Sequence, residues 1–80
     1  MNDIDKLRIM LPHWIEHNTA HAGEFVQWAE KVQNSGHVHR DDIAAALARA
    51  VSACEEVTAA LEDALESAGG ALDHDHDHSH

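Results

Sequence analysis

The sequence has little basic charge: five Lys and Arg stand against fifteen Asp and Glu, which gives a formal net charge of −10. A surface that binds nucleic acid needs Lys and Arg to neutralise phosphates, so this balance argues against a nucleic-acid-binding protein and favours cations as partners. A single Cys cannot form a disulfide framework and fits a reducing, cytoplasmic location. We find no apolar run long enough to span a bilayer and no signal peptide, and therefore expect no membrane attachment.

Aromatic residues are also scarce: Trp14, Phe25 and Trp28 are the only ones in 80 residues. A chain of this size buries only about 60% of its surface on folding and is marginally stable alone. Because alanine supplies much of the apolar content, we expect a thin core. Association into a homodimer would supply the missing burial.

Apolar residues at helical spacing predict an all-α fold: an antiparallel helical hairpin or coiled coil that dimerises into a four-helix assembly. Long helices are expected over residues 12–34 and 40–68, joined by a short turn that makes them antiparallel. The hairpin and its metal site would occupy residues 1–70. Residues 71–80 would form a disordered, His-rich C-terminal tail.

The N-terminal residues 2–10 are expected to form a separate short helix or turn, capped by Asn2 or Asp3. Pro12 is the only proline in the chain. Because proline lacks a backbone N–H and disfavours helix at the residue before it, we expect a break or bend there.

Each long helix contains an apolar stripe at heptad spacing. The stripe predicted for the first helix is Leu11, Trp14, Asn18, His21, Phe25, Trp28 and Val32, widened by Ile15, Ala22, Val26 and Ala29. The stripe predicted for the second helix is Ile43, Leu47, Ala50, Cys54, Val57, Leu61, Ala64 and Ala68. Trp14 and Trp28 are expected to pack in the core. Asn18 would fix the register between helices or bond a ligand imidazole, and Cys54 would be a small buried residue, with a thiolate ligand or an inter-subunit disulfide as alternatives.

Three histidines, His13, His17 and His21, recur every four residues. On a helix this spacing places their side chains on one face about 80° wide. Adjacent members of such a series can chelate one metal ion, but the outer two Cα atoms lie about 12 Å apart, so all three cannot easily share one. Further ligands are expected from a two-fold copy of the same helix. Glu16 and Glu24 lie nearby as solvated groups or as partners of the imidazoles.

The order His13-Trp14, two residues, His17, three residues, His21 resembles the nickel motif of the CooJ family. Proteins of that family are accessory factors in the maturation of carbon monoxide dehydrogenase. The resemblance implies a small helical homodimer with a His-rich C-terminal tail and Ni(II) as the bound ion. It also implies carbon monoxide dehydrogenase, or its other maturation factors, as the partner.

The chain ends in ALDHDHDHSH, in which His74, His76, His78 and His80 alternate with acidic residues and a serine. In an extended chain this alternation places imidazoles on one side, which suits the collection of divalent ions at several geometries. A purification tag is the other interpretation of this segment. His37 and His39 form a weaker His-x-His pair, for which an exposed loop is the simpler interpretation.

Taken together, these residues predict a protein that binds a divalent ion through imidazoles and is not an enzyme, and the resemblance implies a nickel-binding chaperone or store. The alternative is a coiled-coil dimer with a tail that buffers divalent metals such as Zn, Cu and Co. The segment from His17 to His21 lacks the Glu that a zinc protease needs directly after its first His, because Asn18 occupies that position. We also find no nucleophile–base pattern and no Gly-rich phosphate loop.

Overall fold

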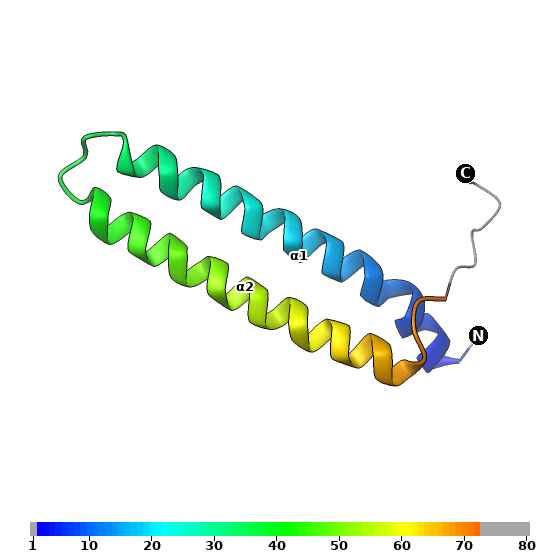
Figure 1. Ribbon diagram of the computed structural model, residues 1–80. Coiled ribbons are helices and arrows are strands. Elements are labelled where there is room, and N and C mark those ends of the chain that lie inside the picture. Colours follow the sequence, from blue (N-terminus) through cyan, green and yellow to red (C-terminus); the bar gives the residue numbers. More distant parts are fainter. Residues whose placement is uncertain (1, 73–80) are drawn as a thin grey trace, which may run out of the picture.

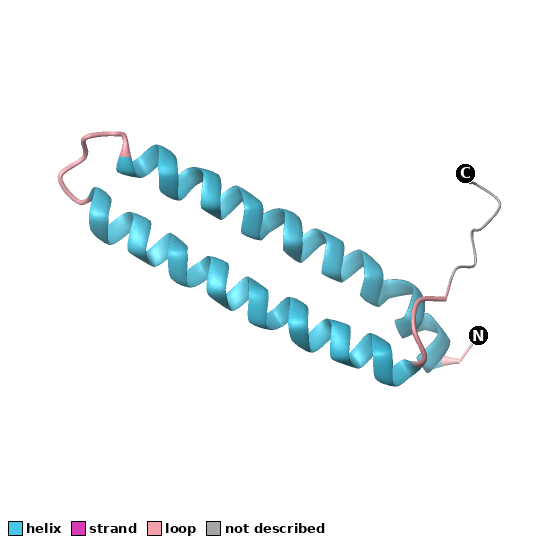
Figure 2. Cartoon of the chain, viewed as in Figure 1, coloured by secondary structure: helices cyan, strands magenta, loops and turns pink. Residues whose placement is uncertain are grey.

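The computed structural model describes residues 2–72 and contains two long antiparallel helices (Figures 1 and 2). Helix α1 is Asp3–Gln33 and helix α2 is Arg40–Ala68, and they pack against each other along their length. The expected all-α hairpin is therefore confirmed. No helix in the described part of the chain is both long and apolar enough to cross a membrane. The four histidines expected to bind metal in the tail lie outside the described residues.

Local sequence signals account for where each helix begins and ends. The side chain of Asn2 caps α1, since its Oδ1 accepts a hydrogen bond from the N–H of Asp5 at 2.7 Å. The turn between the helices contains Gly36 at φ +78°, and α2 ends at Gly69 at φ +115°, both in the left-handed region that glycine adopts at little cost. Asp41 and Asp42 lie in the first turn of α2, where the helix dipole favours acidic side chains.

The expected break at Pro12 is wrong, because α1 runs through this residue without interruption. A proline inside a helix leaves the carbonyl four residues earlier without its usual donor, which here is the carbonyl of Arg8. The N–H of Leu72 donates to that oxygen at 3.1 Å and satisfies it. The helix therefore continues past Pro12, and residues 3–10 are its first turns and not a separate element.

The two helices meet along an inner seam that differs by one residue from the predicted stripes. On α1 the half-buried or buried seam residues are Leu11, Ile15, Asn18, Ala22, Phe25, Ala29 and Val32. On α2 they are Ala44, Leu47, Val51, Cys54, Thr58, Leu61, Leu65 and Ala68. Every second position of the predicted heptad series is correct, and at the others the following residue takes the place in the seam, although Ala50 is also half-buried. On α1 these following residues, Ile15, Ala22 and Ala29, were predicted as the widening of the stripe. Within residues 2–72, only Leu11 and Ala44 are buried, with 2% and 7% of their surface exposed.

The residues displaced from the seam form an outer apolar face: Trp14, His21 and Trp28 on α1, and Ile43, Ala50, Val57 and Ala64 on α2. Each precedes a seam residue by one position, and in an antiparallel pair of helices such positions lie on the same side of the seam. Trp14 is 45% exposed and Trp28 is 55% exposed, so the expectation that both pack in the core is wrong within the chain.

Candidate metal centre

The three motif histidines lie on the exposed surface of α1: His13 and His17 in the half of the helix away from the turn, and His21 just past its midpoint. His13 lies midway between the seam residues Leu11 and Ile15, so it projects from the side of α1 opposite α2. The four-residue spacing then rotates His17 and His21 successively toward the outer apolar face. The three histidines therefore do not lie on one straight face of α1. They form a stripe that runs obliquely around the helix, from His13 on the side opposite α2 to His21 among the apolar side chains of the outer face.

The structure brings His17 and His21 together. Their ring centroids are 4.5 Å apart in an edge-to-face arrangement. Nδ1 of His21 lies 3.2 Å from Oε1 of Glu24, and the ring stacks 6.1 Å from Phe25. A carboxylate on one ring nitrogen orients an imidazole and leaves the other nitrogen available for a metal ion. Glu24 therefore suits the supporting role expected for it.

Within residues 2–72 of the isolated chain, no group of three or more His, Cys, Asp or Glu side chains is placed to hold a metal ion. This follows from the geometry of the stripe, because one helix presents only an adjacent pair to one ion. His17 and His21 supply two imidazole donors. Structural and catalytic metal sites in proteins commonly use three or four protein ligands, so a metal site that includes this pair would need donors from outside the described chain.

The position of His21 along the hairpin defines where those donors would come from. The amide of Asn18 bonds residues 54 and 58, which sets the antiparallel register. In that register Trp28 lies beside Ile43 and Ala50, and Trp14 lies beside Val57 and Ala64. His21 lies between the two tryptophans. Among the residues that define the outer apolar face it is the ionisable one, and it occupies the middle; at the Trp28 end, Nζ of Lys31 lies 4.4 Å from the centroid of the Trp28 ring.

Asn18 fixes the register and contacts no histidine through its amide nitrogen. Its Nδ2 donates to the carbonyl oxygen of Cys54 at 2.6 Å and to Oγ1 of Thr58 at 2.8 Å. Both amide hydrogens are thus used across the inner seam. Two roles were expected for Asn18: fixing the register between the helices or bonding a ligand imidazole. The structure confirms the first. Cys54 is half-buried beside it, as expected for a small seam residue.

The His37 and His39 pair lies in the exposed turn between the helices. Nδ1 of His37 accepts a hydrogen bond from the N–H of His39 at 3.0 Å, and the two rings are 5.7 Å apart. In the neutral ring this leaves a protonated Nε2, so His37 shapes the turn and presents no free lone pair. The expected exposed loop is confirmed.

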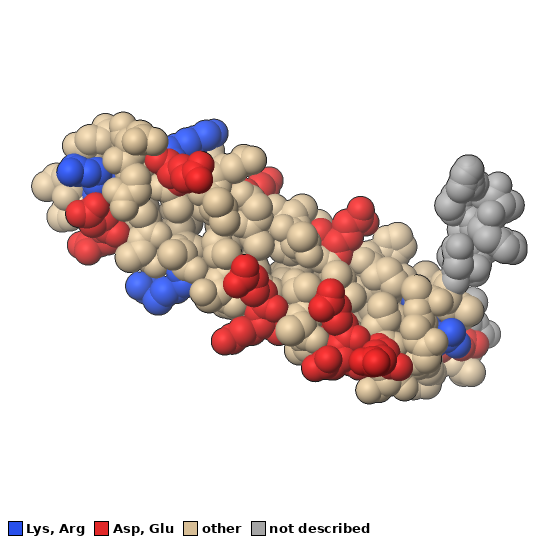
Figure 3. Space-filling view, viewed as in Figure 1, with Lys and Arg blue, Asp and Glu red and all other residues tan. Residues whose placement is uncertain are grey.

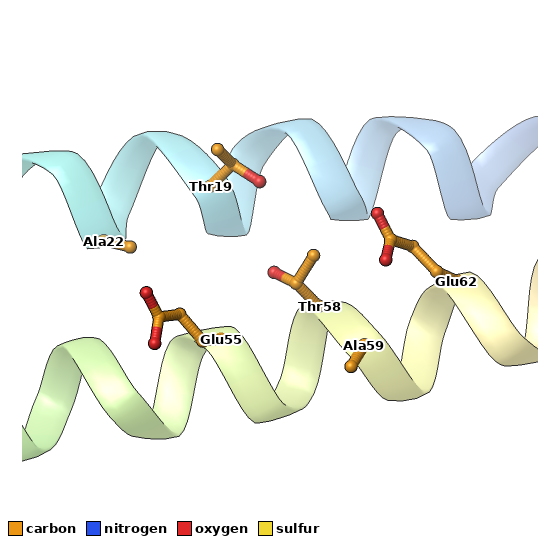
Figure 4. Close-up of a pocket in the computed structure, with 6 residues that line it drawn as sticks. All are labelled: Thr19, Ala22, Glu55, Thr58, Ala59 and Glu62. Atoms are coloured by element: carbon orange, nitrogen blue, oxygen red, sulfur yellow. The ribbon is translucent and has the colours of Figure 1, made fainter.

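The opposite side of the hairpin is acidic. Figure 3 shows Asp and Glu side chains gathered over the C-terminal half of α2. A shallow groove of about 300 Å³ runs between the helices there, lined by Thr19, Ala22, Glu55, Thr58, Ala59 and Glu62 (Figure 4). Glu55 and Glu62 are seven residues apart on α2, about 10 Å along the axis, which is too far for both carboxylates to bind one ion.

Sequence reasoning missed Arg8, whose guanidinium bonds the end of α2. Nε donates to the carbonyl oxygen of Gly70 at 2.7 Å, and Nη2 donates to that of Gly69 at 3.2 Å. The available signal was Pro12: a proline in the fourth position after Arg8 leaves a helix carbonyl that another segment must satisfy.

Comparison with known proteins gives one family. Residues 7–68 match the family described as “Domain of unknown function (DUF8180)”. The chain belongs to this family. The match covers most of both helices and all three motif histidines, and it ends before the His-rich tail. Neither the curated proteins nor the solved structures contain a significant match.

Proposed function

We propose that this protein is a cytoplasmic nickel chaperone or store, which dimerises through its outer apolar face and supplies Ni(II) for the maturation of carbon monoxide dehydrogenase. The observation that supports this role best is the place of His21. It lies in the middle of an apolar face that the hairpin leaves uncovered, beside a second imidazole at 4.5 Å. Nickel and the client enzyme follow from the resemblance of the motif to the CooJ family.

Dimerisation through the outer apolar face is favoured because it would remove exposed apolar surface from water. A tryptophan side chain buries about 150–250 Å² when fully covered, and Trp28 is 55% exposed. At about 25 cal/mol per Å², covering the rest of Trp28 contributes roughly 2–3 kcal/mol per protomer as an upper bound. Trp14, Ile43 and Val57 are exposed on the same face and would add to this. The result is a four-helix assembly.

A two-fold axis through the centre of this face would bring the two copies of His21 close together. The pair of His17 and His21 from each protomer would then offer four imidazole nitrogens around the axis. His13 of each protomer lies outside this set, because it projects from the other side of α1. Imidazole ligands also bind Cu(II) and Zn(II), and Cu(II) more tightly than Ni(II), so preference for nickel would depend on site geometry and metal supply.

Calorimetric titration with Ni(II) tests this proposal in a full-length variant in which the four tail histidines are replaced by Ala. We name it the tail-histidine variant; its substitutions are at His74, His76, His78 and His80. The proposal predicts that one tight site per dimer remains. His17 belongs to both adjacent pairs of the motif, so His17→Ala in this background should be the most damaging single change. His37→Ala is the matched control, because it removes an exposed imidazole from the turn.

The alternative function is a coiled-coil dimer whose tail buffers divalent ions generally. It is favoured by the lack of a three-ligand group within residues 2–72 of one chain. This alternative predicts that the tail-histidine variant loses its tight binding. It also predicts that His17→Ala and His37→Ala behave alike, a result that would refute the helical metal site.

A further inference from the structure

The groove between the helices, on the side of the hairpin away from the outer apolar face, is an open surface with an apolar floor. It holds about 300 Å³ and is lined by Thr19, Ala22, Glu55, Thr58, Ala59 and Glu62. The seam residues at this level are Ala22 and Thr58, so no large side chain fills the space between the helices there. Figure 4 shows Glu55 and Glu62 pointing from α2 toward α1, with Thr58 between them. We call this surface the acidic groove.

The carboxylates of the acidic groove have no basic partner within residues 2–72. The ion pairs of this part of the chain involve neither Glu55 nor Glu62. The five Lys and Arg side chains are engaged or lie elsewhere: Lys6 and Arg49 project from the far sides of their helices, Arg8 bonds the end of α2, Lys31 lies over the Trp28 ring, and Arg40 donates to the carbonyl of His37. A cationic partner would therefore meet no competing base in the acidic groove.

The acidic groove also brings like charges together along α2. Glu55, Glu62 and Glu66 lie on one stripe of the helix at steps of seven and four residues, with Ala59 between the first two. Like charges four residues apart on a helix repel each other and destabilise it. Charge complementarity therefore favours a cationic occupant, whose binding would relieve this repulsion. The apolar floor favours an occupant that also brings apolar side chains, which a metal ion does not.

The spacing of the two carboxylates indicates the form of that occupant. Glu55 and Glu62 are about 10 Å apart along α2, at 1.5 Å per residue. Two basic residues seven places apart on another helix have the same separation and lie on the same side, with a residue three or four places along between them. On an extended strand, side chains of one face repeat at about 6.6 Å and about 13 Å, and neither distance matches. A helix laid along the groove therefore reaches both carboxylates.

A second copy of this chain does not supply such a helix. It would need two Lys or Arg residues seven places apart on one helix face. The five basic residues are at positions 6, 8, 31, 40 and 49, and no two of them have this separation. The outer apolar face, through which the dimer is proposed to form, lies on the other side of the seam. The acidic groove therefore stays open in that dimer and is available to a different protein.

We propose that the acidic groove docks a basic amphipathic helix of another protein. Two Lys or Arg residues of this helix, seven places apart, pair with Glu55 and Glu62, and a small apolar residue between them covers Ala22 and Thr58. The docked helix lies beside α1 and α2 as a third helix, at the crossing angle of about 20° that is common in helical bundles. Docking requires neither bound nickel nor the dimer, so this inference does not rest on the proposed function.

Fluorescence anisotropy with a labelled synthetic peptide tests this inference on the full-length protein. The probe is an Ala- and Gln-rich helix of about 21 residues, long enough to be helical in water, with two Lys seven places apart and one Leu between them. The control peptide has the same composition with the two Lys five places apart, on different sides of the helix. EDTA in the buffer removes metal ions from the measurement. The first peptide should bind more tightly, and added salt should weaken its binding.

Two double variants of the protein remove the same charge from different sides of α2. Glu55→Gln with Glu62→Gln should weaken binding on the order of tenfold, because two exposed ion pairs of modest strength are lost. Glu56→Gln with Asp63→Asn is the matched control, with the same spacing on the side of α2 away from the seam. It should leave the affinity unchanged at about 0.15 M salt, where charges more than about 8 Å away are screened.

Reversing the charges gives the complementary result. Glu55→Lys with Glu62→Lys should lose the basic peptide and bind the peptide that has Glu in place of both Lys. Circular dichroism checks that every variant keeps its helices, so that a loss of binding is not a loss of fold.

Equal affinity of the two Lys peptides, or equal losses in the two Gln and Asn double variants, would show a response to net charge alone and overturn the docking groove. Displacement of the probe by an equal concentration of spermidine would assign the groove to a small polycation and overturn the helical occupant. Neither result touches the nickel site, because the titration contains EDTA and no nickel. Failure of the nickel titration would in turn leave the docking groove standing.

Discussion

Replacing Asn18 tests how the hairpin sets its register. In Asn18→Ala the seam loses two hydrogen bonds, at 2.6 Å to the Cys54 carbonyl and at 2.8 Å to the Thr58 hydroxyl. A net contribution of about 1 kcal/mol each gives a loss of about 2 kcal/mol. The better helix propensity of Ala returns about 0.6 kcal/mol. The expected decrease in the free energy of unfolding is therefore about 1.4 kcal/mol.

Thermal unfolding followed by circular dichroism measures this loss. For a domain of this size, 1 kcal/mol shifts the melting temperature by about 4–8 °C, so Asn18→Ala should melt about 6–11 °C lower. All variants must be compared at one protein concentration, because dimerisation would make the melting temperature concentration-dependent. Gln27→Ala is the matched control: it truncates an exposed amide on α1 and should melt at or slightly above the wild-type temperature.

Asn18→Leu gives the complementary result. It replaces a polar seam residue with an apolar one that has the same number of side-chain heavy atoms, which should leave stability at or above that of the wild type but remove the bonds that define the register. We would abandon this account of Asn18 if Asn18→Ala had the same melting temperature as Gln27→Ala, or if Asn18→Leu proved less stable than Asn18→Ala.

Three further predictions concern the dimer, the helix end and pH. Val57→Glu places a charge in the outer apolar face and should convert a dimer into monomers in light scattering, whereas Glu56→Gln beside it should not. Gly69→Ala should lower the free energy of unfolding in guanidinium by about 1–2 kcal/mol, because φ there is +115°, and Gly23→Ala, inside α1 with open space around it, should not lower it. Nickel affinity should fall on acidification and binding should release protons, measured by calorimetry in buffers of different ionisation enthalpy, because only a neutral imidazole binds metal.

The helix boundaries were predictable because local chemistry determines them. Asn2, Gly36 and Gly69 each mark an end or a turn, through a side-chain cap or a left-handed backbone angle that needs no information from the rest of the chain. The continuity of α1 through Pro12 was not predictable in the same way. It depends on a hydrogen bond from Leu72, sixty residues away in the sequence.

The candidate site, like the helices, was predictable in part. The spacing of the three histidines placed them on one side of α1, and the geometry of a helix excluded their all binding one ion. Spacing alone did not show which two imidazoles would lie in contact, since the pair His13 and His17 and the pair His17 and His21 have the same spacing in the sequence. The structure distinguishes His21 by its contacts with Glu24 and Phe25.

The seam was misplaced by one residue because two stripes fit the sequence equally well. Leu11, Asn18, Phe25 and Val32 belong to both stripes, and either the preceding or the following neighbours complete the pattern. Side-chain size decides between them. On α1 the following neighbours include Ala22 and Ala29, which let two helices approach closely, whereas the preceding ones include two tryptophans. A tryptophan between closely packed helices would force them apart.

The same choice of seam links dimerisation to metal binding in the proposed function. The bulky residues excluded from the seam lie beside it, and His21 lies in their stripe. An ion bound by histidines of both protomers would bind the dimer more tightly than the monomer. Linkage then requires that dimerisation strengthen nickel binding by the same factor by which nickel strengthens dimerisation. A protein of this kind would release its ion when the outer apolar face opens, so a partner that competes for this face would also draw out the metal.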